Sequence, residues 1–288
     1  MDNLAFSLLV TITIFSLMLS VGLDQKLSDL ASIWKEPGHL VSSLVAVIVL
    51  VPLIAAFLIW MFNLPPAAAT GIAVLASAPG APLTTFRSRM AGADIRFVSS
   101  LQISLAGLAI IVTPLTLAAF DLAFDTLTDP VRFWYVFRQV AIVTFLPVVI
   151  GLGLRKFAPG IADKIQKPLN IAANLLFLLL VLALITIILI SPELRGMLAI
   201  GWIPALAIAL MICGGLAGGH LLGGPDQPHR AGLAIASIAR NIGLAVYIVG
   251  LSKTAATAIP VILAYLLIGV LLAMPYTMMS KKMTSTNG

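Results

Sequence analysis

Apolar segments of about 20 residues follow one another along almost the whole chain, and a helix of that length crosses the hydrocarbon layer of a bilayer. A mean hydropathy of +1.11 and a charged fraction of 10% set the 288-residue chain far from soluble domains. We therefore predict an all-α polytopic membrane protein with nine transmembrane helices. They are expected at 4–23, 39–62, 67–90, 95–120, 133–154, 169–190, 200–222, 231–252 and 255–279.

The distribution of lysine and arginine predicts the orientation of the chain. In a nine-span arrangement twelve of these residues fall on one side of the membrane and four on the other, and Arg240 belongs to neither side. Cationic loops stay in the cytoplasm, so we expect an inner (plasma) membrane protein with its N-terminus outside and its C-terminus cytoplasmic. The excess of basic residues is therefore explained by the topology. The sequence has no patch of basic residues interleaved with aromatic ones, the pattern that would indicate nucleic-acid binding.

Two further arginines lie near the cytoplasmic end of the third span. Arg87 and Arg89 are separated by one residue. We expect their long side chains to reach the headgroup region, as basic residues near helix ends commonly do. A place in an inward-facing vestibule is the alternative.

Arg240 lies in the middle of the apolar run "ASIARNIGLAVYIV", residues 236–249. A guanidinium at a helix centre costs roughly 2.5 to 3.5 kcal/mol on insertion scales, so the protein must compensate it. All eleven acidic residues fall in loops or at span ends, which leaves no carboxylate at membrane depth. Because the histidines are also scattered near span ends, we expect no metal or catalytic cluster, no cofactor and no enzymatic activity.

Two stretches of the chain, about 160 residues apart, resemble each other. "TGIAVLASAPG" (70–80) aligns with "AGLAIASIARN" (231–241) without a gap. The same offset pairs the first four spans with the last four, and a separation of five spans reverses the direction of crossing. We therefore predict two inverted repeats, an arrangement found in secondary transporters. The first covers 1–120 with four spans, the second covers 133–288 with five, and 121–132 is the periplasmic connection.

Both aligned stretches carry residues that interrupt a helix at membrane depth. Proline removes an amide donor and clashes with the preceding turn, and glycine adds conformational freedom. Matching interruptions in two halves indicate a binding site near the bilayer midplane, whereas a single proline kink would indicate nothing more than a bend. We expect two broken helices to cross at Ser77, Pro79, Gly80, Pro82, Ser237 and Gly243.

These interrupted regions resemble those of the bile acid:sodium symporter family. "ASAPGAPLTTFRSRMAGADIRFVSSLQISLAGLAIIVTP" (76–114) is similar to the first crossing region, and "ASIARNIGLAVYIV" to the second. The family pattern of the second is an acidic residue, three residues, then Gln-Asn and a Gly-Leu-Ala helix. The likeness extends over nearly the whole chain in span order and loop length. Many bacterial members have ten spans, and this chain looks like a nine-span version without the first helix.

The resemblance implies a core domain at about 39–120 and 200–279 and a panel domain at about 4–23 and 133–190. It also implies a secondary transporter that takes up an organic anion, bile acid-like or a small carboxylate, with sodium by alternating access. The alternative is a membrane sensor or channel on the same scaffold that does not transport. The implied partners are the organic anion and the lipid bilayer, and the oligomeric state is left open.

The chain departs from the family pattern in the second crossing. Ala236 stands where the family has its sodium-coordinating acid, Arg240 stands where it has the coordinating glutamine, and Asn241 is kept. Sodium needs several hard oxygen ligands and favours an anionic one. We therefore expect degenerate sodium sites.

The first crossing departs in a similar way. The family's Ser-Asn pair falls on Thr84 and Thr85, and its hydroxyl-bearing helix positions fall on Val98 and Gln102. Sodium stays possible, but its usual ligands are largely missing. The residual ion positions are Thr84, Thr85, Gln102 and Ala236, and no other metal site is expected.

Two roles for Arg240 follow. The guanidinium could occupy the space of the ion and hold the broken helices together through backbone carbonyls. Alternatively it could reach the substrate cavity and pair with a carboxylate, assisted by the positive ends of the half-helices. The candidate substrate-binding residues are Thr84, Thr85, Arg240 and Asn241.

Overall fold

The computed structural model of the protein describes residues 4–25, 34–124, 133–190, 201–250 and 255–286. Nearly all of these residues are helical. The first elements are α1 (Leu4–Asp24), α3 (Pro37–Leu44), η1 (Val45–Leu50), α4 (Val51–Phe62), α5 (Pro66–Ser77), α6 (Thr84–Met90), α7 (Ile95–Phe124) and α8 (Phe133–Gln139). The others are η2 (Val140–Phe145), α9 (Leu146–Phe157), α10 (Pro159–Ile190), α12 (Trp202–Leu222), α13 (Gln227–Ile238), α14 (Ile242–Val249), η3 (Ala255–Ala258) and α15 (Ile259–Thr286).

Six helical segments of the described chain are long and apolar enough to cross a membrane. They have 21 to 31 residues, and their mean hydropathy lies between 1.9 and 3.0. Two shorter apolar helices, Leu8–Asp24 and Pro66–Ser77, accompany them. The predicted all-α polytopic membrane architecture is therefore confirmed, whereas the count of nine spans stays a prediction.

Two helices extend beyond the predicted spans. Helix α7 continues to Phe124, so the first residues of the connection expected at 121–132 are helical, and the rest of it lies outside the described residues. Helix α10 begins at Pro159 instead of residue 169. Proline is well suited to the first turn of a helix, where its missing amide proton would have no partner. The polar residues that follow it extend α10 beyond its apolar part.

Two of the long segments contain a π-helical turn shortly before a proline. Pro52 follows η1, and Pro147 follows η2. In the π-helical register the amide of residue i bonds to the carbonyl of residue i−5, so the carbonyl of Val47 would face Pro52, which has no amide proton. This carbonyl is thereby available to a donor from elsewhere in the molecule.

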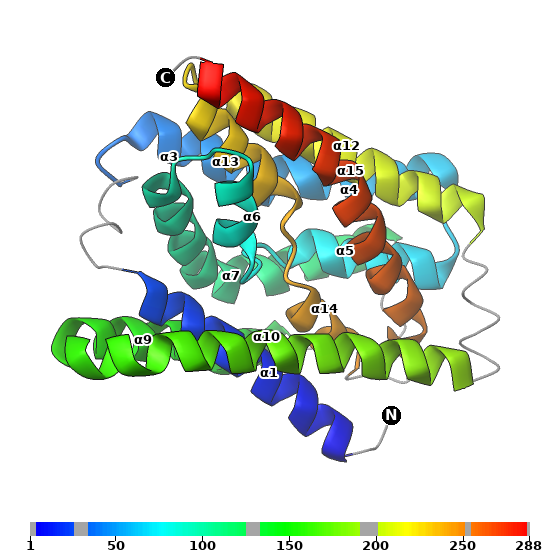
Figure 1. Ribbon diagram of the computed structural model, residues 1–288. Coiled ribbons are helices and arrows are strands. Elements are labelled where there is room, and N and C mark those ends of the chain that lie inside the picture. Colours follow the sequence, from blue (N-terminus) through cyan, green and yellow to red (C-terminus); the bar gives the residue numbers. More distant parts are fainter. Residues whose placement is uncertain (1–3, 26–33, 125–132, 191–200, 251–254, 287–288) are drawn as a thin grey trace.

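Helices α1, α9 and α10 pack against one another as one layer of the molecule (Figure 1). The closest approach, between α1 and α9, is made through two glycines. A Cβ atom on Gly22 would lie 2.3 Å from the carbonyl oxygen of Val148, and one on Gly151 would lie 2.5 Å from that of Leu19. Small residues at such contacts let membrane helices pack backbone to backbone.

The remaining helices form the larger part of the molecule and enclose most of two elements, α5 and α13. Helix α12 packs on α4, α13 and α15, and α5 contacts α4, α7, α14 and α15. Every residue of 68–77 in α5 and of 231–238 in α13 is buried. A helix that is apolar on all sides belongs in the interior. Both helices end inside the molecule, where the candidate site lies.

We expect Gly151→Ala to destabilise the purified protein by about 1–3 kcal/mol, the usual range for an overpacked contact. The added methyl group would collide with the backbone of α1. Gly153→Ala is the matched control, since nothing lies within 4 Å of a Cβ atom there. Thermal unfolding in detergent measures the difference, and equal unfolding temperatures for the two variants would contradict the close α1–α9 contact.

Candidate functional site

Two helices are interrupted near the centre of the molecule, and their unwound segments pair with each other. Helix α5 ends at Ser77 and α6 begins at Thr84, while α13 ends at Ile238 and α14 begins at Ile242. Between them, Pro79 and Arg240 form an antiparallel bridge. The amide of Asn241 donates to the carbonyl of Ala78 at 2.9 Å, and the amide of Ala81 donates to that of Ala239 at 3.2 Å. Each break thus supplies backbone partners for the other.

Local sequence explains where the breaks occur. Pro79 and Pro82 lack amide protons, and Gly80 has φ = +80°, a conformation that favours glycine. In the second break the side chain of Asn241 caps α14 by accepting the amide of Leu244 at 3.0 Å. The bridge also pairs the two residues, Pro79 and Arg240, that the gapless alignment of 70–80 with 231–241 places opposite each other.

The helix ends at the two breaks are satisfied in the same way. Ser77 donates from Oγ to the carbonyl of Ala73, and Ser237 donates from Oγ to that of Leu233, both at 2.8 Å. Both serines are fully buried. Their hydroxyl groups therefore serve the helix carbonyls four residues earlier instead of facing a cavity.

The guanidinium of Arg240 sits between three backbone segments. Its Nε and Nη2 donate to the carbonyl of Ser237 at 3.1 and 2.7 Å, Nη1 donates to that of Ala76 at 3.2 Å, and Nη2 donates to that of Val47 at 3.0 Å. The residue is only 2% exposed. Arg240 therefore ties the end of α13 to the end of α5 and to the π-helical turn η1.

Carbonyl oxygens compensate the buried charge of Arg240 without a carboxylate. The guanidinium donates to backbone carbonyls that the breaks and the π-helical turn leave available. Hydrogen bonds to charged groups contribute about 1.5–3 kcal/mol each, so several together exceed the insertion cost of the guanidinium. A ring of carbonyls around one positive charge is also the environment that a bound cation would require.

The other break is supported by Gln102 of α7. Its Nε2 donates to the carbonyls of Ala81 and Pro82 at 3.0 and 3.3 Å, and its Oε1 accepts the hydroxyl of Thr85 at 2.7 Å. The hydroxyl of Thr84 donates to the carbonyl of Ala81. The sequence-predicted residues Thr84, Thr85 and Gln102 thus lie together, but their polar groups are engaged within the protein.

Two of the positions that supply sodium ligands in the family pattern offer no side-chain oxygen here. Ala236 and Val98 are buried and pack together in an apolar cluster. Asn241 is different, because it is 1% exposed and its Nδ2 has no hydrogen-bond partner within the described chain. Among the four candidate substrate-binding residues, Asn241 is the one that keeps an uncommitted buried donor.

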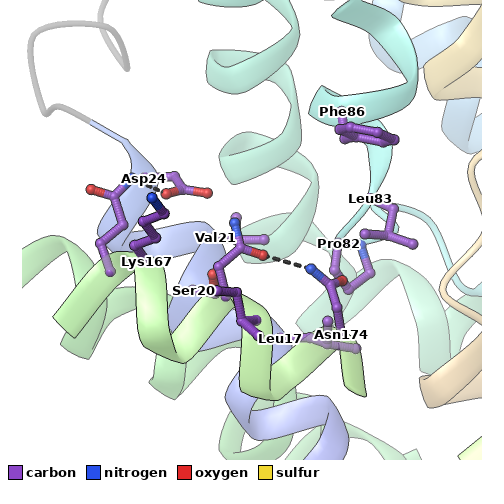
Figure 2. A pocket seen from close by; sticks show the side chains of 12 residues that line it. Leu17, Ser20, Val21, Asp24, Pro82, Leu83, Phe86, Lys167 and Asn174 are labelled. Carbon is purple, nitrogen blue, oxygen red and sulfur yellow. Dashed lines mark hydrogen bonds between the residues drawn. The ribbon is translucent and has the colours of Figure 1, made fainter. Parts of the chain in front are cut away.

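Two hollows lie between the crossing and the layer of α1 and α10. The larger has a volume of about 820 Å³ and is bounded by α1 and α10 on one side and by Pro82, Leu83 and Phe86 on the other (Figure 2). The smaller, of about 120 Å³, lies at the crossing itself and is lined by Arg240 and Asn241 among others. Leu17, Pro82 and Leu83 line both hollows, so the two adjoin.

Sequence reasoning missed the polar residues that α10 contributes to the larger hollow. Lys167, Asn170 and Asn174 line it, and Figure 2 shows Lys167 and Asn174 on the wall opposite Phe86. The spacing of four residues between Asn170 and Asn174, at the start of the apolar part of α10, would have indicated one polar face.

Arg87 and Arg89 have different surroundings, because Arg89 is exposed whereas Arg87 is partly buried. Arg87 is half-buried, lines the smaller hollow and places Nη2 3.4 Å from the carbonyl of Gly269 in α15. Two positions apart in α6, these arginines point in different directions, which charge counting along the sequence does not reveal.

Comparison with known proteins gives a consistent set of relatives. A model of the Sodium Bile acid symporter family matches residues 11–192, a range that includes the first break. The chain is similar to the Probable sodium/metabolite cotransporter BASS3, chloroplastic, of Arabidopsis thaliana (27% identity over 157 residues) and to the protein of that name of Oryza sativa subsp. japonica (25% over 159 residues). The aligned parts cover 54% and 55% of this chain but only 36% and 37% of those proteins.

We expect Arg240→Met to destabilise the protein by roughly 3 kcal/mol or more, because it leaves several buried carbonyls without a donor. Arg240→Lys keeps the charge but cannot span all three carbonyls, so its unfolding temperature should lie between those of Arg240→Met and the wild type. Arg138→Met, at an exposed position of α8, is the control and should unfold like the wild type. Unaltered thermal unfolding of Arg240→Met would rule out a structural role for the guanidinium.

Proposed function

Because the chain belongs to the sodium bile acid symporter family, a family of transporters and not of enzymes, we propose that it carries an organic anion across the membrane by alternating access. The substrate is bile acid-like or a small carboxylate. In this proposal the protein lies in the inner (plasma) membrane with its N-terminus outside and its C-terminus in the cytoplasm. The observation that supports it most directly is that two broken helices meet beside a hollow, and that the opposite wall of this hollow is formed by α1 and α10.

The moving parts in this proposal are two domains built from inverted repeats at 1–120 and 133–288. A panel that contains α1, α9 and α10 moves against a core that contains the crossing. The larger hollow lies between these two groups of helices, where a rocking motion would open and close it. Binding sites at the interface of two repeats are typical of secondary transporters.

The substrate's anionic group binds at the crossing, next to Asn241. Its unpartnered Nδ2 is a buried donor, and the N-terminal end of α14 carries a partial positive charge. Thr84 and Thr85 shape the same region through their bonds to Ala81 and Gln102 and do not contact the substrate directly. The body of the substrate extends into the larger hollow.

The transporter does not use the sodium sites that the family name implies. Arg240 supplies a permanent positive charge among the carbonyls of Ala76, Val47 and Ser237. On the other side of the crossing, the donor Nε2 of Gln102 occupies the position in front of the Ala81 and Pro82 carbonyls. A tethered donor at each position leaves no carbonyl cluster free to coordinate a mobile cation.

Counterflow in proteoliposomes tests the transport proposal. Vesicles preloaded with unlabelled cholate, pantoate or pyruvate should accumulate the corresponding labelled anion faster than empty vesicles, because a loaded carrier exchanges its substrate. A channel or a sensor on the same scaffold would give no accelerated exchange. Absence of counterflow with every one of the three anions would contradict the proposal.

Replacement of sodium by choline separately tests the proposal that Arg240 and Gln102 take the place of bound sodium. We expect the counterflow rate, and the rise in unfolding temperature that the transported anion produces, to change less than about twofold on this replacement, since ligand stabilisation follows the anion's own affinity. The double variant Arg240→Gln/Ala236→Glu, which removes the guanidinium and adds a carboxylate, should make both quantities sodium-dependent. Strong sodium dependence of the wild type would contradict the proposal.

A further inference from the structure

Arg87 is a second arginine beside the crossing, and its surroundings differ from those of Arg240. It is half-buried in α6 and lines the smaller hollow. Within the described chain its guanidinium has one hydrogen-bond acceptor, the carbonyl of Gly269, at the long distance of 3.4 Å, and no carboxylate lies within ion-pair distance. Arg240, by contrast, donates to three carbonyls at 2.7 to 3.2 Å.

A guanidinium has five N–H donors, so that of Arg87 keeps most of its hydrogen-bonding capacity uncommitted. A partly buried cation with a single long hydrogen bond is unfavourable for the folded state, and ionisable residues at membrane depth commonly mark substrate pathways. Arg240 is fixed because its partners are part of the protein. Arg87 has the capacity to bind a group that arrives from outside.

The smaller hollow presents other features that favour an anion. Arg240 and Asn241 line it as well. The guanidinium of Arg240 is engaged with backbone carbonyls, whereas Asn241 has an unpartnered Nδ2 and an Oδ1 that accepts the amide of Leu244. The start of α14 adds the positive end of a helix dipole. Phe177 and Leu266 contribute an apolar wall, which strengthens the attraction between charges by excluding water.

We propose that Arg87 is the charge partner of the transported substrate. The inference rests on the proposed function and deepens it. The carboxylate or sulfonate of the substrate accepts hydrogen bonds from the guanidinium of Arg87 and from Asn241 Nδ2 inside the smaller hollow. Such charge-assisted bonds, bidentate where the planar fork meets a carboxylate, are stronger than neutral ones.

The volumes of the two hollows determine how the substrate lies. The smaller one, about 120 Å³, holds only a compact group, given that a water molecule occupies about 30 Å³ in the liquid. The adjoining hollow of about 820 Å³ has room for a bulkier body. It offers apolar contacts with Phe86 and polar groups from Ser20, Asn170 and Asn174 (Figure 2).

The substrate class that fits both hollows is an anion with a compact head and a larger amphipathic body. The head enters first and meets Arg87 at the crossing. The body stays between α6 and α10, where hydroxyl or carbonyl groups can hydrogen-bond to the two asparagines of α10. Asn174 Nδ2 already donates to Asn170 Oδ1 at 2.7 Å, so Asn170 Nδ2 and Asn174 Oδ1 are the groups that remain for the substrate. We expect hydroxylated or oxo-substituted anions to bind more tightly than a plain fatty acid.

Equilibrium binding to the purified full-length protein tests the role of Arg87. The probe is cholate, pantoate or pyruvate, whichever the wild type binds most tightly, together with the neutral methyl ester of the same compound. Arg87→Gln should weaken binding of the anion by about tenfold to a hundredfold, the loss of a charge-assisted hydrogen bond. Arg87→Lys should weaken it only several-fold, since the charge is kept. The methyl ester should bind wild type and Arg87→Gln equally weakly, and Arg138→Gln should match the wild type.

Thermal unfolding without ligand separates a binding role from a structural one. Arg87→Gln should unfold at the wild-type temperature or above, because it removes a partly buried charge that the protein does not satisfy. A lower ligand-free unfolding temperature, or unchanged affinity for the anion, would overturn the inference and leave the proposed function intact. A wild-type protein that binds none of the three anions would overturn both.

Discussion

The contact between one guanidinium and the carbonyls of three backbone segments is the interaction on which this structure depends. Unwound backbone is tolerated at membrane depth only where its polar groups find partners inside the protein. Arg240 provides donors to Ala76, Ser237 and Val47 at once, and backbone amides beside the bridge between Pro79 and Arg240 pair the two breaks directly. Without these contacts both breaks would expose unsatisfied carbonyls. Nothing would then fix the orientation of α5 relative to α6, or of α13 relative to α14.

A tethered cation has a different consequence from a bound ion. An ion can leave, so its binding energy can be coupled to a gradient, whereas a guanidinium on the chain contributes the same charge in every state of a transport cycle. The donor Nε2 of Gln102 has the same character on the other side of the crossing. In the proposed mechanism the crossing is therefore a fixed element, and the group that comes and goes is the substrate.

The two arginines near the crossing illustrate how hydrogen bonding separates structural from functional charge. Arg240 is nearly inaccessible and its partners are protein carbonyls, whereas Arg87 faces a hollow with one long contact. Both residues carry the same charge in apolar surroundings, so residue type does not distinguish them. The number of uncommitted N–H donors does distinguish them. It assigns a stabilising role to Arg240 and substrate recognition to Arg87.

The sequence by itself determined the membrane class, the positions of the long apolar segments and the sites of both breaks. These properties depend on local hydropathy and on proline, glycine and Arg240, which act within a few residues along the chain. Only the tertiary structure decided that Arg240 reaches Val47, that Gln102 turns its amide donor toward the first break, and that Arg87 and Asn174 face hollows. Such pairings join residues that are far apart in the chain, and they depend on how helices rotate and pack, which the periodicity of a single segment does not specify.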